Sequence, residues 1–129
     1  MSHQHIAVWL DHHEAKIFHV GAETFDVATV RAPHHHVRRH PQVTAAHDHP
    51  ADAKHYYHEV AQALAAATEI LVVGPSTAKL ELVKHIHHHD AALVPKIVGV
   101  ETVDHPTDGQ LVAYMRSYFK AVDAKPSQT

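Results

Sequence analysis

Apolar and polar positions in the first third of the chain alternate with a period of two, which predicts β-strands over 5–10, 15–20 and 23–31. In the first segment (HIAVWL), apolar side chains fill both sets of alternating positions. This pattern is typical of a central strand that is covered on both faces. The connections between the three segments are short and polar, so we expect an antiparallel meander. His19 alternates with apolar residues in the second segment, and we expect it to be buried.

Apolar residues at helical spacing recur in the rest of the chain and predict three helices. The stripe in 51–68 contains Tyr57 but not Tyr56, so we expect Tyr57 to be buried and Tyr56 to be exposed. A second helix, capped by Ser76, ends near His89. The remaining predicted elements are strands over 69–73 and 96–103 and a helix over 108–122 that begins with a capping box of Thr107 and Gln110.

The order of these elements is βββαβαβα. A meander followed by two strand–helix units predicts an α/β fold with a mixed five-stranded sheet and helices on both faces. We expect a single domain over 1–122 and a polar, flexible tail over 123–129. Residues 32–50 have three Pro, six His and two Arg with almost no apolar periodicity, so we expect a functional loop there.

Composition narrows the possible functions. The 129 residues contain no Cys, which excludes disulfides, thiolate zinc sites and cysteine nucleophiles. No apolar run approaches the length of a membrane span and no secretory signal is visible, so we expect a cytoplasmic protein with no membrane partner. The formal charge of −3 argues against a uniformly basic nucleic-acid binder. The 18 His residues make the chain increasingly cationic below pH 7.

The densest cationic stretch is 34–40 (HHHVRRH). Arginine side chains there can contact phosphates, and imidazoles can stack on bases or bind phosphate when protonated. We therefore interpret this stretch as an RNA-binding surface; a solvated loop without a partner and a metal site are the alternatives. The candidate nucleic-acid contacts are Arg31, His34, His35, His36, Arg38, Arg39, His40 and Lys54.

A second histidine cluster lies at the end of the second helix. His85 and His89 are four residues apart and can hold a metal such as zinc or nickel from one helical face, so His85, His88 and His89 are the candidate ligands. Histidines near a helix C-terminus also complement the helix dipole, and the chain has no HExxH motif. We expect no cofactor, with a metal as the alternative. On this helix Glu81, His85 and His88 project away from the apolar stripe.

Three carboxylates raise the alternative of a magnesium-dependent nuclease. Asp11 follows the first strand, and Glu59 and Asp104 are the other available acids. Asp11 is more simply a turn residue, and no complete catalytic constellation is present, so we expect no enzymatic activity. Gly74-Pro75-Ser76 lies between a predicted strand and the N-terminus of a predicted helix, where backbone N–H groups could bind an anion. The segment matches neither a Walker A loop nor a dinucleotide fingerprint.

Residues 56–64 (YYHEVAQAL), 70–76 (ILVVGPS) and 98–103, followed by Asp104 and His105, carry a family resemblance. Together with the element order, they resemble the middle domain of Pelota and of archaeal and eukaryotic class-1 peptide release factors. The resemblance covers about residues 5–120. It implies a ribonuclease H-like fold without a nuclease site, and the chain looks like a stand-alone bacterial translational machinery protein.

The resemblance also bears on activity. In release factors the loop that corresponds to 32–50 carries Gly-Gly-Gln, which reaches the peptidyl-transferase centre, whereas 32–50 has no Gly. Peptide release is therefore not implied. Pelota uses a basic loop at this place to contact ribosomal and transfer RNA, and HHHVRRH resembles that loop more closely. The expected function is a non-catalytic, translation-associated protein that binds RNA or the ribosome through 32–50.

Overall fold

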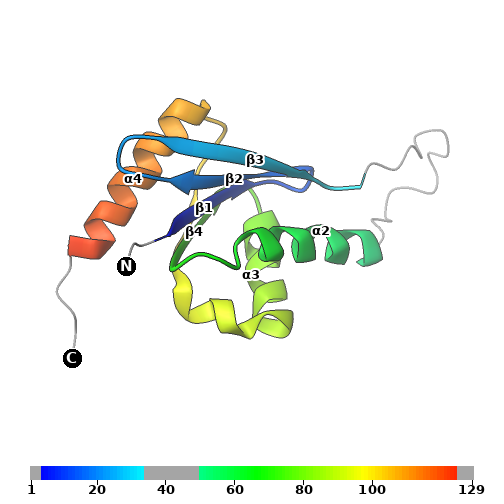
Figure 1. Cartoon of the computed structure of the whole chain (residues 1–129). Coiled ribbons are helices and arrows are strands. Elements are labelled where there is room, and N and C mark those ends of the chain that lie inside the picture. The colour runs from blue at the N-terminus through cyan, green and yellow to red at the C-terminus, as the bar shows by residue number, and fades with distance from the viewer. Residues whose placement is uncertain (1–3, 34–49, 125–129) are drawn as a thin grey trace.

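A computed structural model describes residues 4–33 and 50–124 of the chain (Figure 1). The sheet is built from β1 (His5–Leu10), β2 (Glu14–Val20), β3 (Phe25–Arg31), β4 (Glu69–Gly74) and β5 (Ile97–Thr102). The helices are α2 (Pro50–Ala63), α3 (Ala78–His89), the short 3₁₀ helix η3 (Ala91–Lys96) and α4 (Asp108–Ala124). The predicted order, βββαβαβα, is confirmed, with η3 as an additional element that the sequence pattern did not predict.

The five strands form one mixed sheet in the order β3-β2-β1-β4-β5. The first three strands are the predicted antiparallel meander, in which β1 pairs with β2 and β2 pairs with β3. β4 then pairs with β1 in parallel, and β5 pairs with β4 in parallel. This is the mixed five-stranded sheet of the α/β fold that the sequence predicts.

The two faces of the sheet carry separate hydrophobic cores, and β1 contributes to both. One set of its side chains packs with residues of α2 and α3, and the other set packs with residues of α4. In Figure 1, α4 accordingly lies on one side of the sheet, while α2 and α3 lie on the other. The first set is Ile6, Val8 and Leu10, and the second is Ala7 and Trp9. The two-sided burial inferred for residues 5–10 is confirmed.

The helix termini depart from expectation in two places. α2 ends at Ala63, before the predicted end at residue 68. The N-cap of α3 is Thr77 rather than Ser76, and it makes no side-chain capping hydrogen bond. The capping box of α4 is confirmed, because the Gln110 backbone N–H donates to Thr107 Oγ1 (3.1 Å) and the Thr107 N–H donates to Gln110 Oε1 (3.0 Å). The predicted tail lies, from residue 125 onward, outside the described residues.

Two histidines differ in burial from the prediction. His19 is exposed on β2, although it pairs with Ile6 and shares the face of Ile17, whose side chains pack in the core with α2 and α3. His85 of α3, expected to project away from the core, is instead buried, with 8% of its surface exposed. Among the described residues, no helix is long and apolar enough to cross a membrane.

Gly74, the last residue of β4, lies directly against the backbone of β1. A Cβ atom added at Gly74 would collide with the carbonyl oxygen of Leu10, which is held in the sheet and cannot give way. We expect Gly74→Ala to lower the free energy of unfolding by about 2 kcal/mol or more, measured by urea denaturation.

The matched control is Gly109→Ala in the first turn of α4, where an added Cβ meets no atom within 4 Å. We expect this variant to have an unchanged stability, or one raised by up to about 1 kcal/mol, because alanine favours the helix and restricts the unfolded chain. Equal stability of the Gly74 and Gly109 variants would contradict the close approach of β4 to β1.

Candidate functional site

The carboxyl ends of four strands lie at one edge of the sheet. β1, β4 and β5 are parallel, and β3 has the same direction because the intervening β2 is antiparallel to both β1 and β3. The segments that leave this edge are the β1–β2 turn, the β4–α3 connection, the β5–α4 connection and the chain that follows β3. Open α/β sheets bind ligands at the carboxyl ends of their strands, so this edge is the candidate site.

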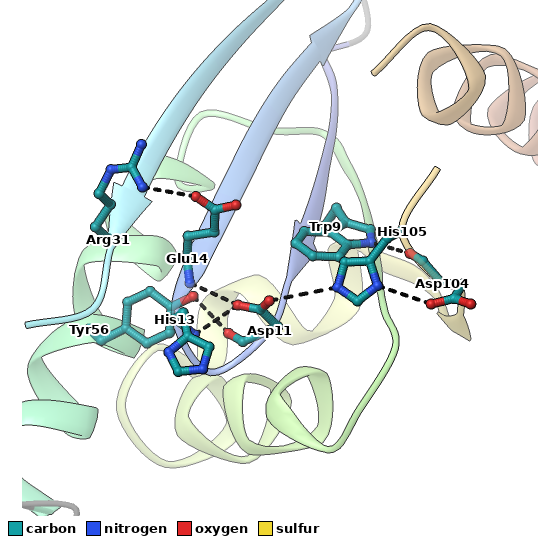
Figure 2. Close-up of polar contacts among 8 residues, drawn as sticks. All are labelled: Trp9, Asp11, His13, Glu14, Arg31, Tyr56, Asp104 and His105. Atoms are coloured by element: carbon teal, nitrogen blue, oxygen red, sulfur yellow. Dashed lines mark hydrogen bonds and ion pairs between the residues drawn. The ribbon is translucent and has the colours of Figure 1, made fainter. Parts of the chain in front are cut away.

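Asp11 organises the β1–β2 turn at this edge. Its Oδ1 accepts hydrogen bonds from the backbone N–H groups of His13 (2.8 Å) and Glu14 (2.9 Å), and the Asp11 N–H donates to the Glu14 carbonyl at 3.0 Å (Figure 2). Aspartate favours turns because its side chain can accept such local backbone donors. The interpretation of Asp11 as a turn residue is confirmed by these contacts.

Tyr56 ties α2 to this turn. Its hydroxyl donates to the backbone carbonyl of Asp11 at 2.9 Å, and its side chain is only 1% exposed. Burial, together with the nearby Asp11 carboxylate, raises the pKa of the Tyr56 phenol above its usual value. The expectation that Tyr56 is exposed is therefore wrong: a residue just outside the apolar stripe is buried because its polar end finds a backbone acceptor.

On the other side of Asp11 lies a cluster from the β5–α4 connection. Trp9 Nε1 donates to the Asp104 carbonyl at 2.7 Å, and its ring contacts the His105 ring edge-on with centroids 5.1 Å apart. His105 Nδ1 lies 3.0 Å from Asp104 Oδ1, and His105 Nε2 lies 4.0 Å from Asp11 Oδ2. Figure 2 shows His105 between the two carboxylates. These contacts connect the end of β1 to the segment after β5.

The three carboxylates of the nuclease alternative do not come together. Two groups of three potential metal ligands occur among residues 4–33 and 50–124, and neither contains Asp11, Glu59 or Asp104. Asp11 already accepts two backbone hydrogen bonds, and the Asp104 side chain is 93% exposed. Glu59 lies on α2, where its carboxylate is 3.9 Å from His55 Nε2. The geometry of a two-metal nuclease, with clustered carboxylates, is absent from this part of the chain.

The predicted RNA-contact residues divide into two sets. His34, His35, His36, Arg38, Arg39 and His40 lie outside the described residues. Arg31 and Lys54 are described and both are exposed. Arg31 Nη1 donates to Glu14 Oε1 at 3.1 Å, so its charge is partly compensated at the end of β3 (Figure 2). Lys54, in the second turn of α2, lines a shallow hollow with histidines of α2 and α3.

That hollow gathers histidines from two helices. Its lining residues are Lys54, His55, His58, His85 and His89. His85 and His89 contact each other, with ring centroids 4.6 Å apart, as their spacing predicts. The predicted ligand His88 is exposed, with its ring 6.3 Å from that of His89, and it is not part of the close ligand group. Burial lowers the pKa of the His85 imidazole, and the neighbouring His89 lowers it further.

Sequence reasoning did not single out two members of this cluster. His58 of α2 and Asp90, directly after α3, form a close group of potential ligands with His85. The spacing of His55 and His58 places them on one side of α2, next to the buried stripe, and this signal could have drawn attention to His58. Asp90 could only be assigned once the packing of α2 against α3 was known.

Ser76 and the β4–α3 connection show no anion site. The Ser76 hydroxyl is buried without a hydrogen-bond partner among the described residues, so the prediction that it caps α3 is wrong. Lys79 instead donates to the Ser76 carbonyl at 2.7 Å, which fixes the connection from the helix side. The ammonium of Lys79 is thereby hydrogen-bonded within the protein, and the residue is buried.

Comparison with known proteins identifies the architecture. No protein-family profile and no curated protein matches the chain. Solved structures do match: Pelota from Thermoplasma acidophilum has a TM-score of 0.61 at 18% identity, over 92% of this chain and 33% of that protein. The archaeal translation termination factor aRF1 has a TM-score of 0.55 at 17% identity, over 93% of this chain and 38% of that one. The chain has a Pelota-like fold.

A third comparison extends the likeness beyond archaea. Saccharomyces cerevisiae Dom34, described as a translation termination-like factor involved in RNA quality control, has a TM-score of 0.56 at 12% identity, over 93% of this chain and 37% of Dom34. The chain thus spans about a third of the length of each of these proteins. The Pelota-like fold expected from residues 56–64, 70–76 and 98–103 is confirmed.

The contact between Tyr56 and Asp11 is testable by removing one oxygen. We expect Tyr56→Phe to lower the free energy of unfolding by about 1 kcal/mol, because the partly buried Asp11 carbonyl loses its donor while the packing of the ring is kept. Thermal and urea unfolding measure this change. Tyr114→Phe removes a hydroxyl from a partly exposed ring on α4 and should change stability by less than about 0.5 kcal/mol. If both variants are equally stable, the hydroxyl of Tyr56 does not anchor α2.

Proposed function

We propose that this protein is a non-catalytic, translation-associated factor that binds RNA or the ribosome through the 32–50 segment. The observation that carries the proposal is the Pelota-like fold: it extends over more than nine-tenths of the chain, and the similar structures include a translation termination factor and a factor involved in RNA quality control. The basic 34–40 stretch follows β3 and precedes α2. This place in the element order corresponds to that of the basic loop of Pelota.

The charges of the described residues favour one side of the sheet edge for RNA. Around the β5–α4 connection, Asp104 is almost fully exposed and Asp11 lies beside His105, so a phosphate would meet negative charge there. At the other side, Arg31 ends β3 and Lys54 lies near the start of α2. Both flank the chain segment that contains Arg38 and Arg39, and phosphate contacts need such clustered cations.

Removing two arginines tests this surface. We expect Arg38→Ala/Arg39→Ala to weaken binding to purified ribosomes and to reduce the steepness of log affinity against log salt by up to about two units. Each phosphate contact that is lost lowers the number of counterions released on binding. Co-sedimentation over a series of salt concentrations measures both effects.

The control Lys84→Ala/Lys120→Ala removes two exposed positive charges from α3 and α4 and should retain affinity and slope. A wild-type protein that does not co-sediment with ribosomes or RNA at low salt would refute the function itself. Unchanged binding by the double-arginine variant would remove the 34–40 stretch from the contact surface.

The histidines of the 34–40 stretch make a separate prediction about pH. An imidazole with a pKa near 6.5 is about one-tenth protonated at pH 7.5 and about three-quarters protonated at pH 6. Positive charge therefore increases as the pH falls, and affinity for RNA should increase across the same interval. A binding titration at the two pH values measures the change, with unfolding followed in parallel to show that the fold is intact.

The triple variant His34→Gln/His35→Gln/His36→Gln should lose most of this pH dependence. The control His19→Gln/His87→Gln/His88→Gln removes three exposed imidazoles from β2 and α3 and should retain it. A pH response that is equal in the two triple variants would mean that the histidines of the 34–40 stretch do not contact RNA.

A further inference from the structure

His58, His85 and Asp90 present three potential metal ligands to one point between α2 and α3. One ligand atom from each residue lies within 4.8 Å of the other two. His85 Nε2 and Asp90 Oδ2 are 3.7 Å apart. In a tetrahedral site with bonds of about 2.0–2.1 Å, two ligand atoms lie about 3.4 Å apart. The observed spacing therefore needs only small side-chain rotations to close around one ion.

Two of these atoms are buried and make no hydrogen bond to any described residue. His85 is 8% exposed, and its Nε2 is buried without a hydrogen bond to any described residue. Asp90 Oδ2 is likewise buried without one. Buried polar atoms are normally hydrogen-bonded, and an imidazole nitrogen and a carboxylate oxygen that lie 3.7 Å apart without a hydrogen bond call for a ligand that both can bind. A cation meets this requirement because both atoms offer lone pairs.

The surrounding residues distinguish a cation from an anion. Lys54, His55 and His89 also line the hollow, and the Lys54 ammonium alone would favour a phosphate. The Asp90 carboxylate, however, would oppose an anion at the point where the three ligand atoms converge. Lys54 is exposed, so its flexible ammonium can turn to solvent when a cation binds. Two imidazoles and one carboxylate are a common ligand set for zinc, with the fourth position left open.

We propose that His58, His85 and Asp90 bind one Zn²⁺ ion that holds α2 to α3. His89, whose ring centroid is 4.6 Å from that of His85, is a neighbour of this ligand group. This site differs from the one predicted from helical spacing: His58 and Asp90 are ligands, and His88 is not. The inference stands apart from the proposed RNA-binding function, since none of its three ligands lies in the 32–50 segment.

The test uses the full-length protein without an affinity tag, purified without a metal column and freed of metal with a chelator. Calorimetric titration with Zn²⁺ should show one tight equivalent. His58→Ala, which changes an exposed residue, and Asp90→Asn, which keeps the shape of the side chain, should each weaken that equivalent by about 100-fold or more. Zn²⁺ should also raise the thermal unfolding temperature of the wild type and have little effect on the His58 variant.

Two controls separate this site from adventitious binding by a histidine-rich chain. His87→Ala/His88→Ala removes two exposed imidazoles next to the site, and His34→Ala/His35→Ala/His36→Ala removes three from the 32–50 segment; both should retain the tight equivalent. Loss of that equivalent in either control, or its retention in His58→Ala and Asp90→Asn, would overturn the proposal. If a third ligand variant, His85→Ala, does not fold, His58→Ala and Asp90→Asn decide the question without it.

Discussion

The double burial of β1 is the constraint on which the rest of the structure depends. Successive side chains of this strand enter different cores, Ile6 and Val8 toward α2 and α3, and Ala7 and Trp9 toward α4. A shift of one residue in the register with β2 or β4 would exchange the two sets and place Trp9 in the wrong core. The register is therefore fixed by packing on both faces, and with it the position of Asp11 just beyond the end of the strand.

Much of the fold is encoded in local patterns, and the failures have physical causes. The alternation in 5–10 predicts a strand buried on both faces, and the capping box at Thr107 predicts where α4 begins. The end of α2 is not encoded in this way, because the alanines after Ala63 favour a helix and no glycine or proline stops it. Tyr56 is buried through a hydrogen bond to Asp11, 45 positions earlier, which helical spacing does not reveal.

Local sequence patterns predict the candidate sites less completely than they predict the fold. Spacing within one helix identifies the pair His85 and His89, because residues four apart share a face. It gives the wrong direction for His85, since burial of this face depends on how α3 packs against α2. His58 and Asp90 join the cluster only through that packing. Local periodicity thus finds ligands on a single element, whereas a site between elements requires the tertiary structure.

α2 connects the two proposals. The helix begins at Pro50, the last residue of the 32–50 segment. Tyr56 ties the helix to the β1–β2 turn, and His58 lies in the ligand group with His85 of α3. A divalent cation held by His58, His85 and Asp90 would add two positive charges beside Lys54, within about two turns of the start of α2. Lys54 lines the same hollow, so the ion would strengthen the positive potential on the side of the sheet edge where RNA contact is proposed. Electrostatics alone would then couple the two sites. Because coupling between binding sites is reciprocal, bound RNA would raise the affinity for the metal by the same factor by which bound metal raises the affinity for RNA.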